Sequence, residues 1–438
     1  MKNEGGFFMK AIEVQNNKLK GIVKVPPSKS MAHRAIICAA LGSGISIIEN
    51  IDYSDDINAT IDGMMALGAS IEKDNDKLTV RGAFHEESNK NTVRVIDCNE
   101  SGSTLRFLVP VSLLFSGITK FVGRGNLGKR PLDTYYDIFK EQGIKYSTLD
   151  GKLNLMVKGL LSSGEFSLPG NISSQFITGL LFTLPLLEGD SKIIITTELE
   201  SKGYIDLTLS CMRDFGISIE NKDYKEFIIK GNQGYISRNY RVEGDYSQGA
   251  FYLCANALGS DVEVADLRED SLQGDKEVID ILERMGVNFT YGDKVTCEVS
   301  NELGATLIDA SQCPDIIPVI SLVAALSKGR TEIINAGRLR IKECDRLKAV
   351  ATELNKLGAK IEEKSEGLVI HGVQELEGGV EVWSWKDHRI AMTLAIAATR
   401  CKRPIIIKDY DCVAKSYPKF FEDYKKLGGA INEWSMGE

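Results

Sequence analysis

The chain has 438 residues, of which 43% are hydrophobic and 26% charged, the composition of a soluble globular protein. This length exceeds what a single hydrophobic core usually supports, so two or more domains are expected. The net charge of −8 argues against nucleic acid or an anionic membrane as a partner, and no apolar run is long enough to span a bilayer. The first ten residues lack the apolar core of a signal peptide, so we expect a cytoplasmic protein.

Cysteine and histidine usage bears on metals and redox state. The nine cysteines form no CxxC pair, and only four histidines are present. An odd cysteine count without a secretion signal indicates reduced thiols, and the scattered histidines form no zinc-binding pattern. We therefore expect no metal site.

The first candidate binding segment, Ser28–Arg34, follows two prolines that end an extended run. The apolar residues 35–41 then predict a helix, whose unpaired N-terminal N–H groups favour an anion. Lys29, Ser30 and Arg34 add two cations and a hydroxyl at this end. A solvated helix cap with two ordinary surface cations would give the same local pattern.

Two markers recur along the chain with one period. Polar loops open apolar helices six times, at residues 28–34, 100–106, 173–175, 245–247, 314–315 and 387–389. Glycines 70 to 75 residues apart each follow an amphipathic segment and precede an alternating strand, which predicts helix C-terminal caps at Gly68, Gly143, Gly216, Gly286, Gly358 and Gly428. The shared period predicts six copies of one α/β unit, and a unit of this length favours two globular domains of three units over a thin solenoid.

The ends of the chain indicate how these units are distributed. Only one strand follows the glycine of the sixth unit, whereas strands 11–14 and 19–25 precede the first unit. We infer that both N-terminal strands complete the sixth unit. The chain would then divide into one domain of residues 28–245 and another of residues 1–27 plus 246–438.

The polar loops carry cations and a few carboxylates within an acidic protein. Such a focused field suits a small polyanionic ligand, or two. A solvated surface charge remains the ordinary role for any one of these cations. Asp315 also stands just before the apolar run 316–326, where it could simply cap a helix.

One motif resembles a nucleotide-binding loop. Gly123–Gly128 matches the dinucleotide fingerprint and, with Lys129, approaches a P-loop. However, Arg130 stands where the magnesium-binding Ser or Thr would be, and no acidic residue ends a strand about twenty residues on. We therefore do not expect a nucleotide here.

From about residue 11 to the end, the chain resembles the enolpyruvyl transferase family, and within it the 5-enolpyruvylshikimate-3-phosphate synthases. The stretches that carry the resemblance are residues 27–34, 130–132, 173–176, 243–245, 340–346, 387–392 and 414–418. The resemblance implies a pair of inside-out α/β domains, each of three βαβαββ-type units, with a ligand cleft between them. It also implies a monomer without cofactor.

The activity implied is the transfer of the enolpyruvyl group of phosphoenolpyruvate to the 5-hydroxyl of shikimate 3-phosphate, with release of phosphate, in aromatic amino acid biosynthesis. The implied contacts with shikimate 3-phosphate are Lys29, Ser30, Arg34, Ser173, Ser174, Gln175, Ser201, Tyr204, Asp315 and Lys342. Those with phosphoenolpyruvate, and with its mimic glyphosate, are Lys29, Gly102, Arg130, Gln175, Arg346, Arg389 and Lys415. Asp315 resembles the base for the 5-hydroxyl, and Glu343 and Lys29 resemble the groups that move a proton at the vinyl carbon.

The chain departs from the usual family pattern at several positions, namely Glu100, Ser101, Ser103, Phe107, Gly203 and Arg338. Two alternatives stay open. A transferase acting on a uridine-diphosphate amino sugar would share the six units, but such enzymes typically use a loop cysteine and lack the Ser-Ser-Gln and Asp-His-Arg sets. A non-catalytic binder of sugar phosphates or nucleotides would gain nothing from the carboxylates of Asp315 and Glu343.

Overall fold

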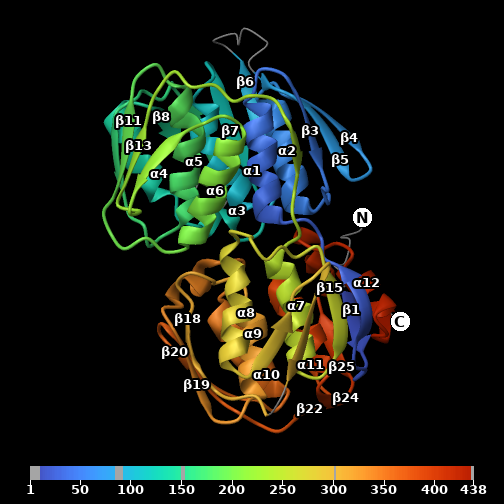
Figure 1. Ribbon diagram of the computed structural model, residues 1–438. Coiled ribbons are helices and arrows are strands. Elements are labelled where there is room, and N and C mark those ends of the chain that lie inside the picture. The colour runs from blue at the N-terminus through green and yellow to red at the C-terminus, as the bar shows by residue number, and fades with distance from the viewer. Residues whose placement is uncertain (1–9, 84–91, 149–152, 300–301, 436–438) are drawn as a thin grey trace, which may run out of the picture. The chain divides into compact units, whose positions relative to one another are not determined.

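The computed structural model describes residues 10–83, 92–148, 153–299 and 302–435. The chain divides into two compact bodies (Figure 1). The N-domain comprises Pro27–Glu243 and Leu272–Gly274, and the C-domain comprises Met1–Pro26, Gly244–Ser271 and Asp275–Glu438. The short segment Leu272–Gly274 therefore belongs to a different domain from both of its neighbours, which the sequence did not predict.

The N-domain contains three four-stranded sheets among its described residues, in the orders β14-β3-β5-β4, β6-β7-β9-β8 and β10-β11-β13-β12. Its α-helices are α1 (Lys29–Ala40), α2 (Asp55–Ala66), α3 (Gly102–Ser112), α4 (Asp133–Gln142), α5 (Ser174–Thr183) and α6 (Lys202–Asp214), with short 3-10 helices η2 (Leu127–Lys129) and η3 (Leu184–Leu186). Its strands are β3 (Ile45–Glu49), β4 (Ser70–Asp74), β5 (Lys77–Arg81), β6 (Val93–Asp97), β7 (Ile118–Val122), β8 (Lys145–Ser147), β9 (Asn154–Lys158), β10 (Glu165–Leu168), β11 (Ser191–Ile195), β12 (Ile219–Lys222), β13 (Glu226–Ile229) and β14 (Asn239–Arg241).

The described part of the C-domain holds three further four-stranded sheets, β16-β17-β15-β2, β18-β19-β21-β20 and β23-β25-β1-β26, and the pair β22-β24. Its α-helices are α7 (Tyr246–Ala257), α8 (Glu277–Arg284), α9 (Ile317–Ala325), α10 (Arg346–Lys356), α11 (His388–Ala398) and α12 (Phe420–Lys426), with 3-10 helices η4 (Gly274–Lys276), η5 (Gly337–Ile341) and η6 (Tyr410–Lys415). Its strands are β1 (Lys10–Val14), β2 (Lys20–Lys24), β15 (Asp261–Ala265), β16 (Val287–Thr290), β17 (Lys294–Val299), β18 (Leu307–Asp309), β19 (Arg330–Ile334), β20 (Lys360–Lys364), β21 (Gly367–His371), β22 (Leu376–Gly378), β23 (Glu381–Trp383), β24 (Cys401–Arg403), β25 (Ile405–Lys408) and β26 (Ile431–Ser435).

The unit built around α3 and α4 shows the repeat. Strand β6 runs parallel to β7, with Val93 opposite Ile118, and α3 makes the crossover between them. Strand β9 is antiparallel to both β7 and β8, so the second half of the unit is a hairpin reached through α4. A parallel pair requires such a helical crossover, whereas antiparallel strands need only a short turn. The predicted βαβαββ unit is confirmed.

The two N-terminal strands belong to different sheets. Strand β1 pairs with β25 and β26, as predicted for the sixth unit. Strand β2 instead runs parallel to β15 in the fourth sheet, so the prediction that both strands complete the sixth unit is wrong for β2. The reason is the unit's own topology, because each unit needs a first strand parallel to the strand after its buried helix. Strand β2 is the first strand of the unit that contains α7 and β15, and β14 is the first strand of the unit that contains α1 and β3. After each of these two strands the chain continues into the other domain.

The glycines at the repeated position end the second helix of each unit with a left-handed backbone. Their φ angles run from 68° to 109°, a region that glycine reaches without a Cβ penalty. The helix caps predicted at Gly68, Gly143, Gly216, Gly286, Gly358 and Gly428 are therefore confirmed.

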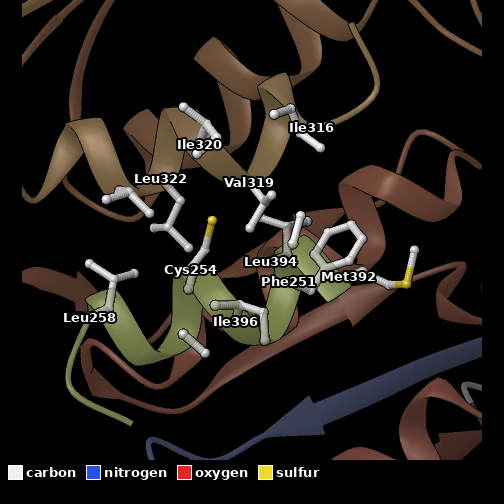
Figure 2. Close-up of a cluster of buried hydrophobic side chains, with 14 of the residues drawn as sticks. Phe251, Cys254, Leu258, Ile316, Val319, Ile320, Leu322, Met392, Leu394 and Ile396 are labelled. Carbon is white, nitrogen blue, oxygen red and sulfur yellow. The ribbon is translucent and has the colours of Figure 1, made fainter. Parts of the chain in front are cut away.

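The first helix of each unit is buried on nearly every side. In the C-domain, Phe251 and Cys254 of α7 pack with Val319 of α9 and with Leu394 and Ile396 of α11 (Figure 2). Such helices lack a polar stripe because sheets and sister helices cover all their faces. No helix among the described residues combines the length and the apolarity needed to cross a membrane.

Candidate active site

Arg346, the first residue of α10, lies at the centre of a buried ionic cluster in the C-domain. Its Nε donates to Asp387 Oδ2 at 2.8 Å, its Nη1 to Asp315 Oδ1 at 2.9 Å and its Nη2 to Glu343 Oε2 at 2.8 Å. The Arg346 side chain is 1% exposed. A guanidinium with its donors distributed over three carboxylates is held in one orientation.

Asp315 accepts from further cations. Arg389 Nη2 donates to Asp315 Oδ2 at 3.0 Å, and Lys342 Nζ lies 3.4 Å from Asp315 Oδ1. Burial by itself would raise the pKa of Asp315, but the charges of Arg389, Lys342 and Arg346 hold it well below its usual range. Asp315 is therefore an ionised carboxylate shared among three cations.

The pKa values of Lys342 and Arg346 are shifted in opposite directions. Burial lowers the pKa of Lys342, with Asp315 opposing the shift. Burial also acts to lower the pKa of Arg346, but Asp387 and the other carboxylates raise it well above its usual range. Arg346 is thus a permanent charge, whereas Lys342 gives up its proton more easily than an exposed lysine would.

Aspartates cap the N-terminal ends of two buried helices, α7 and α11. Asp387 caps α11, since its Oδ1 accepts from Arg389 N at 2.9 Å, and Asp245 caps α7. Asp315 does not cap α9, which was the alternative to a role in the chemistry. The helix begins one residue later than predicted, its N-cap is Ile316, and no side chain caps it. Because Asp315 lies in the turn before the helix, its carboxylate is turned to the cations instead of the helix N–H groups.

A second set of predicted residues lies in the N-domain, where Ser28, Ser101 and Ser173 cap α1, α3 and α5. Lys29 opens α1, and its Nζ donates to Asp56 Oδ2 at 2.8 Å. Each of these serine-capped helix ends still has further N–H groups and a positive dipole end that favour an anion.

Arg34 is buried yet bonded to neutral oxygens. Its Nε donates to Thr208 Oγ1, its Nη1 to the Ser30 carbonyl and its Nη2 to the Tyr204 carbonyl, at 2.9, 2.6 and 2.8 Å. No carboxylate pairs with Arg34 among the residues that the structure describes. Burial lowers the pKa of Arg34 to about 10, and a buried cation without a counter-ion is poised to receive an anion.

Gly102, the first residue of α3, lies among polar side chains. A Cβ built at Gly102 would be 2.6 Å from Arg130 Nη1 and 3.6 Å from Gln175 Oε1. Gln175 accepts from Arg106 Nη1 at 2.8 Å and donates to Ser103 Oγ at 2.9 Å, which fixes both ends of its amide. The structure thus brings together Gly102, Arg130 and Gln175.

The remaining predicted residues occupy element ends. Ser173 accepts from Gln175 N, and Ser174 is the first residue of α5. Ser201 has a left-handed backbone, with φ 57°, and precedes α6, which carries Tyr204. Lys415 ends η6, which packs against α11.

Asp56 and Asp387 were not predicted as site residues. Asp387 anchors Arg346 and caps α11, and Asp56 anchors Lys29. The Asp387-His388-Arg389 motif was a visible signal for the former. In the sequence Asp56 is an ordinary acidic residue in the first turn of α2, and its burial and its contact with Lys29 distinguish it.

The dinucleotide-like segment does not open an α-helix. Gly123–Gly128 follows β7 and leads into η2, and α4 begins only at Asp133. The helix N-terminus that would hold a pyrophosphate is missing from this place in the described structure. No group of three or more His, Cys, Asp or Glu side chains in the described part of the chain is arranged to hold a metal ion.

Solved structures define the class of fold. The EPSP synthase of Acinetobacter baumannii aligns with a TM-score of 0.79 at 24% identity, over 97% of this chain and 100% of that one. The enolpyruvyl transferase NikO of Streptomyces tendae aligns with a TM-score of 0.80 at 18% identity, over 98% and 99% of the two chains. The fold is that of the enolpyruvyl transferases, two inside-out α/β domains.

Sequence comparison narrows the class to one family. The family model of EPSP synthase (3-phosphoshikimate 1-carboxyvinyltransferase) matches residues 14–424. The 3-phosphoshikimate 1-carboxyvinyltransferase of Clostridium beijerinckii is 67% identical, over 98% of this chain and 99% of its own. That of Clostridioides difficile is 63% identical, over 98% and 100%. The chain belongs to the EPSP synthase family and is a transferase.

Proposed function

We propose that this chain transfers the enolpyruvyl group of phosphoenolpyruvate to the 5-hydroxyl of shikimate 3-phosphate and releases phosphate, the activity named in its relatives. The observation that carries the proposal is the ionic cluster, in which Asp315 is shared among Arg346, Arg389 and Lys342. The reaction needs cations for two anionic substrates and a base for a hydroxyl, and this cluster contains both.

The cluster suggests how the base is controlled. Three cations are directed at Asp315 and keep it a weak base. When phosphoenolpyruvate binds, its phosphate and carboxylate oxygens compete for Arg346 and Arg389. Asp315 then loses part of its cationic environment, its pKa rises, and it takes the proton of the 5-hydroxyl as that oxygen attacks C2.

The other roles follow from chemistry and position. Glu343, held by Arg346, or Lys29, held by Asp56, gives a proton to the methylene carbon of phosphoenolpyruvate. When the adduct collapses, that carbon returns the proton to the same group, the C–O bond to phosphate breaks, and the vinyl ether forms. Lys415, Arg130 and Gln175 complete the contacts with phosphoenolpyruvate.

Shikimate 3-phosphate is assigned to donors of the N-domain together with Asp315 and Lys342. Arg34, Ser173, Ser174 and Ser201 supply charge and hydroxyls, and Ser30, Gln175 and Tyr204 complete the set. The buried charge of Arg34 supports this assignment, because an anionic group of the substrate would supply the counter-ion that the protein lacks.

We also propose that the enzyme acts as a monomer in the cytoplasm. The support is that one chain carries every group the reaction needs. The nine free cysteines are also what a reducing compartment would maintain.

A phosphate-release assay with both substrates tests the function. We expect release only when both are present, and no release with a uridine-diphosphate amino sugar in place of shikimate 3-phosphate. Asp315→Asn should abolish most of the release, whereas Asp309→Asn, at an exposed carboxylate of β18, should not. A chain that binds both substrates but releases no phosphate would be a binding protein.

A further inference from the structure

Glu353, on α10, is a buried carboxyl that the proposed reaction does not use. Its side chain is 2% exposed. Lys356 Nζ donates to both of its oxygens, at 3.0 and 2.8 Å, and this lysine is itself partly exposed. An ion pair of residues three apart on a helix is usually a surface feature that contributes little to stability. The burial of Glu353 therefore has another cause.

Two further donors reach Glu353 from the segment Trp383–Asp387, which leads into α11 and is called here the 383–387 turn. Trp383 N donates to Glu353 Oε2 at 3.0 Å, and Trp385 Nε1 donates to Glu353 Oε1 at 2.8 Å. The two indole rings stack on each other, with centroids 5.1 Å apart. Each oxygen of Glu353 thus accepts one hydrogen bond from α10 and one from the turn.

The backbone of the 383–387 turn has a conformation that residues with side chains rarely adopt. Trp385 and Lys386 are both left-handed, with φ 55° and φ 56°. Such residues persist where the surrounding structure fixes them. Ser384 provides one set of contacts, since its Oγ accepts from Lys386 N at 3.1 Å and donates to the Asp409 carbonyl at 2.9 Å. The two hydrogen bonds to Glu353 provide another.

The turn ends at the residue that holds two arginines of the ionic cluster. Asp387 N donates to the Ser384 carbonyl at 2.9 Å, which closes the turn. Asp387 Oδ2 accepts from Arg346 Nε at 2.8 Å, and its Oδ1 accepts from Arg389 N at 2.9 Å. Arg346 and Glu353 are about two helical turns apart on α10, so one side of this helix contacts both ends of the 383–387 turn.

We infer that Glu353 is a positioning residue, which holds the 383–387 turn so that Asp387 orients Arg346 and Arg389 for phosphoenolpyruvate. The inference rests on the proposed function, since it needs phosphoenolpyruvate to contact these two arginines. Loss of the hydrogen bonds to Glu353 should therefore impair phosphoenolpyruvate binding. Shikimate 3-phosphate, which is assigned mainly to donors of the N-domain, should be affected much less.

The test is the steady-state kinetics of Glu353→Gln, with each substrate varied in turn. Glutamine keeps the shape but has a single acceptor oxygen, so one of the two tryptophan donors loses its partner. We expect KM for phosphoenolpyruvate to rise about tenfold, the scale of one lost hydrogen bond, and KM for shikimate 3-phosphate to change by less than about twofold. A merely structural role would reduce the amount of folded enzyme, which lowers the apparent kcat and leaves both KM values unchanged.

Two further variants locate the effect. Trp385→Phe removes the indole N–H and should also raise KM for phosphoenolpyruvate. Combined with Glu353→Gln, it should raise KM by less than the product of the two single effects, because both changes act on the same contact. Lys356→Met removes the ion pair on α10 but leaves the tryptophan bonds, so its KM values should match the wild type. Trp385→Phe carries the test if Glu353→Gln fails to fold.

An unchanged KM for phosphoenolpyruvate in Trp385→Phe and Glu353→Gln would overturn the inference and leave Glu353 a structural residue. An equal rise in KM for both substrates, or the same rise in Lys356→Met, would also overturn it. If the wild type releases no phosphate from the two substrates, the proposed function itself fails, which is a different result from unchanged KM values.

Discussion

Arg346 donates hydrogen bonds to both carboxylate oxygens of Asp387, from Nε to Oδ2 at 2.8 Å and from Nη2 to Oδ1 at 3.4 Å. The same carboxylate caps α11 through Arg389 N. One buried aspartate therefore holds the side chain of one proposed phosphoenolpyruvate-binding arginine and the backbone of another. Burial would raise the pKa of Asp387, but Arg346 keeps it below its usual range.

Asp387→Asn should destabilise the fold and impair phosphoenolpyruvate binding together. Asparagine still caps the helix, but the buried Arg346 loses its fully buried counter-charge, a change that costs about 3–5 kcal/mol when a buried pair is broken. Denaturant unfolding and KM for phosphoenolpyruvate measure the two effects. The matched control is Asp345→Asn, since Asp345 also caps a helix and pairs with an arginine but is partly exposed. Equal losses in both variants would contradict the argument from burial.

Asp315→Asn should lower kcat by at least about a hundredfold, the range for loss of a general base. Its KM for phosphoenolpyruvate should fall, because Arg346, Arg389 and Lys342 each lose the negative charge of Asp315. Steady-state kinetics separates the two parameters. Near-normal turnover would remove Asp315 from the mechanism and leave Glu343 as the remaining candidate for the base.

Gly102→Ala should weaken phosphoenolpyruvate and glyphosate binding while the fold persists. The new methyl group would be 2.6 Å from Arg130 Nη1, and the end of that flexible side chain must move away. We expect KM for phosphoenolpyruvate and the inhibition constant of glyphosate to rise about tenfold or more, in line with a lost charged hydrogen bond. Gly234→Ala is the control, since a Cβ there meets no atom within 4 Å. Unchanged inhibition would show that Arg130 does not contact either ligand.

Arg34→Gln should leave the free protein at least as stable as the wild type, because burying an unpaired guanidinium is costly. The same variant should lose most of its affinity for shikimate 3-phosphate. Thermal unfolding with and without this substrate reports both effects, since a bound ligand raises Tm. Arg213→Gln, on the exposed side of α6, should keep the full shift. A full shift in Arg34→Gln would exclude Arg34 from the binding site.

The stability of the protein should depend on pH through Asp275. Burial, and after it the Asp315 carboxylate, raise the pKa of Asp275 to about 6, so the folded protein holds this proton more tightly than the unfolded chain does. The free energy of unfolding therefore falls as pH rises from about 4 to about 6 and stays lowered above that window. Asp275→Asn should be more stable than the wild type at pH 8 and similar at pH 4. A difference that is constant across this range would contradict the assignment.

Much of the fold could be predicted because it depends on local rules. The glycine at each helix end and the polar cap at each helix start follow from backbone conformation within a few residues, so Gly143 and Ser28 could be assigned without knowing any neighbour. The placement of β2 could not be predicted, because strand pairing depends on which edge is open after other units have folded. An isolated five-residue strand carries no signal that favours β15 over β25.

For the candidate site, the amino-acid sequence alone determined which residue types occur at the helix starts, and through them the family and its chemistry. The tertiary structure decided which charged side chains interact: Lys29 with Asp56, Asp315 with three cations, and Asp275 with Arg389. The physical reason is that Coulomb and desolvation energies depend on separation and burial, which are fixed only when helices distant in the chain pack together. A sequence contains the charges, but their pKa values and partners are properties of the fold.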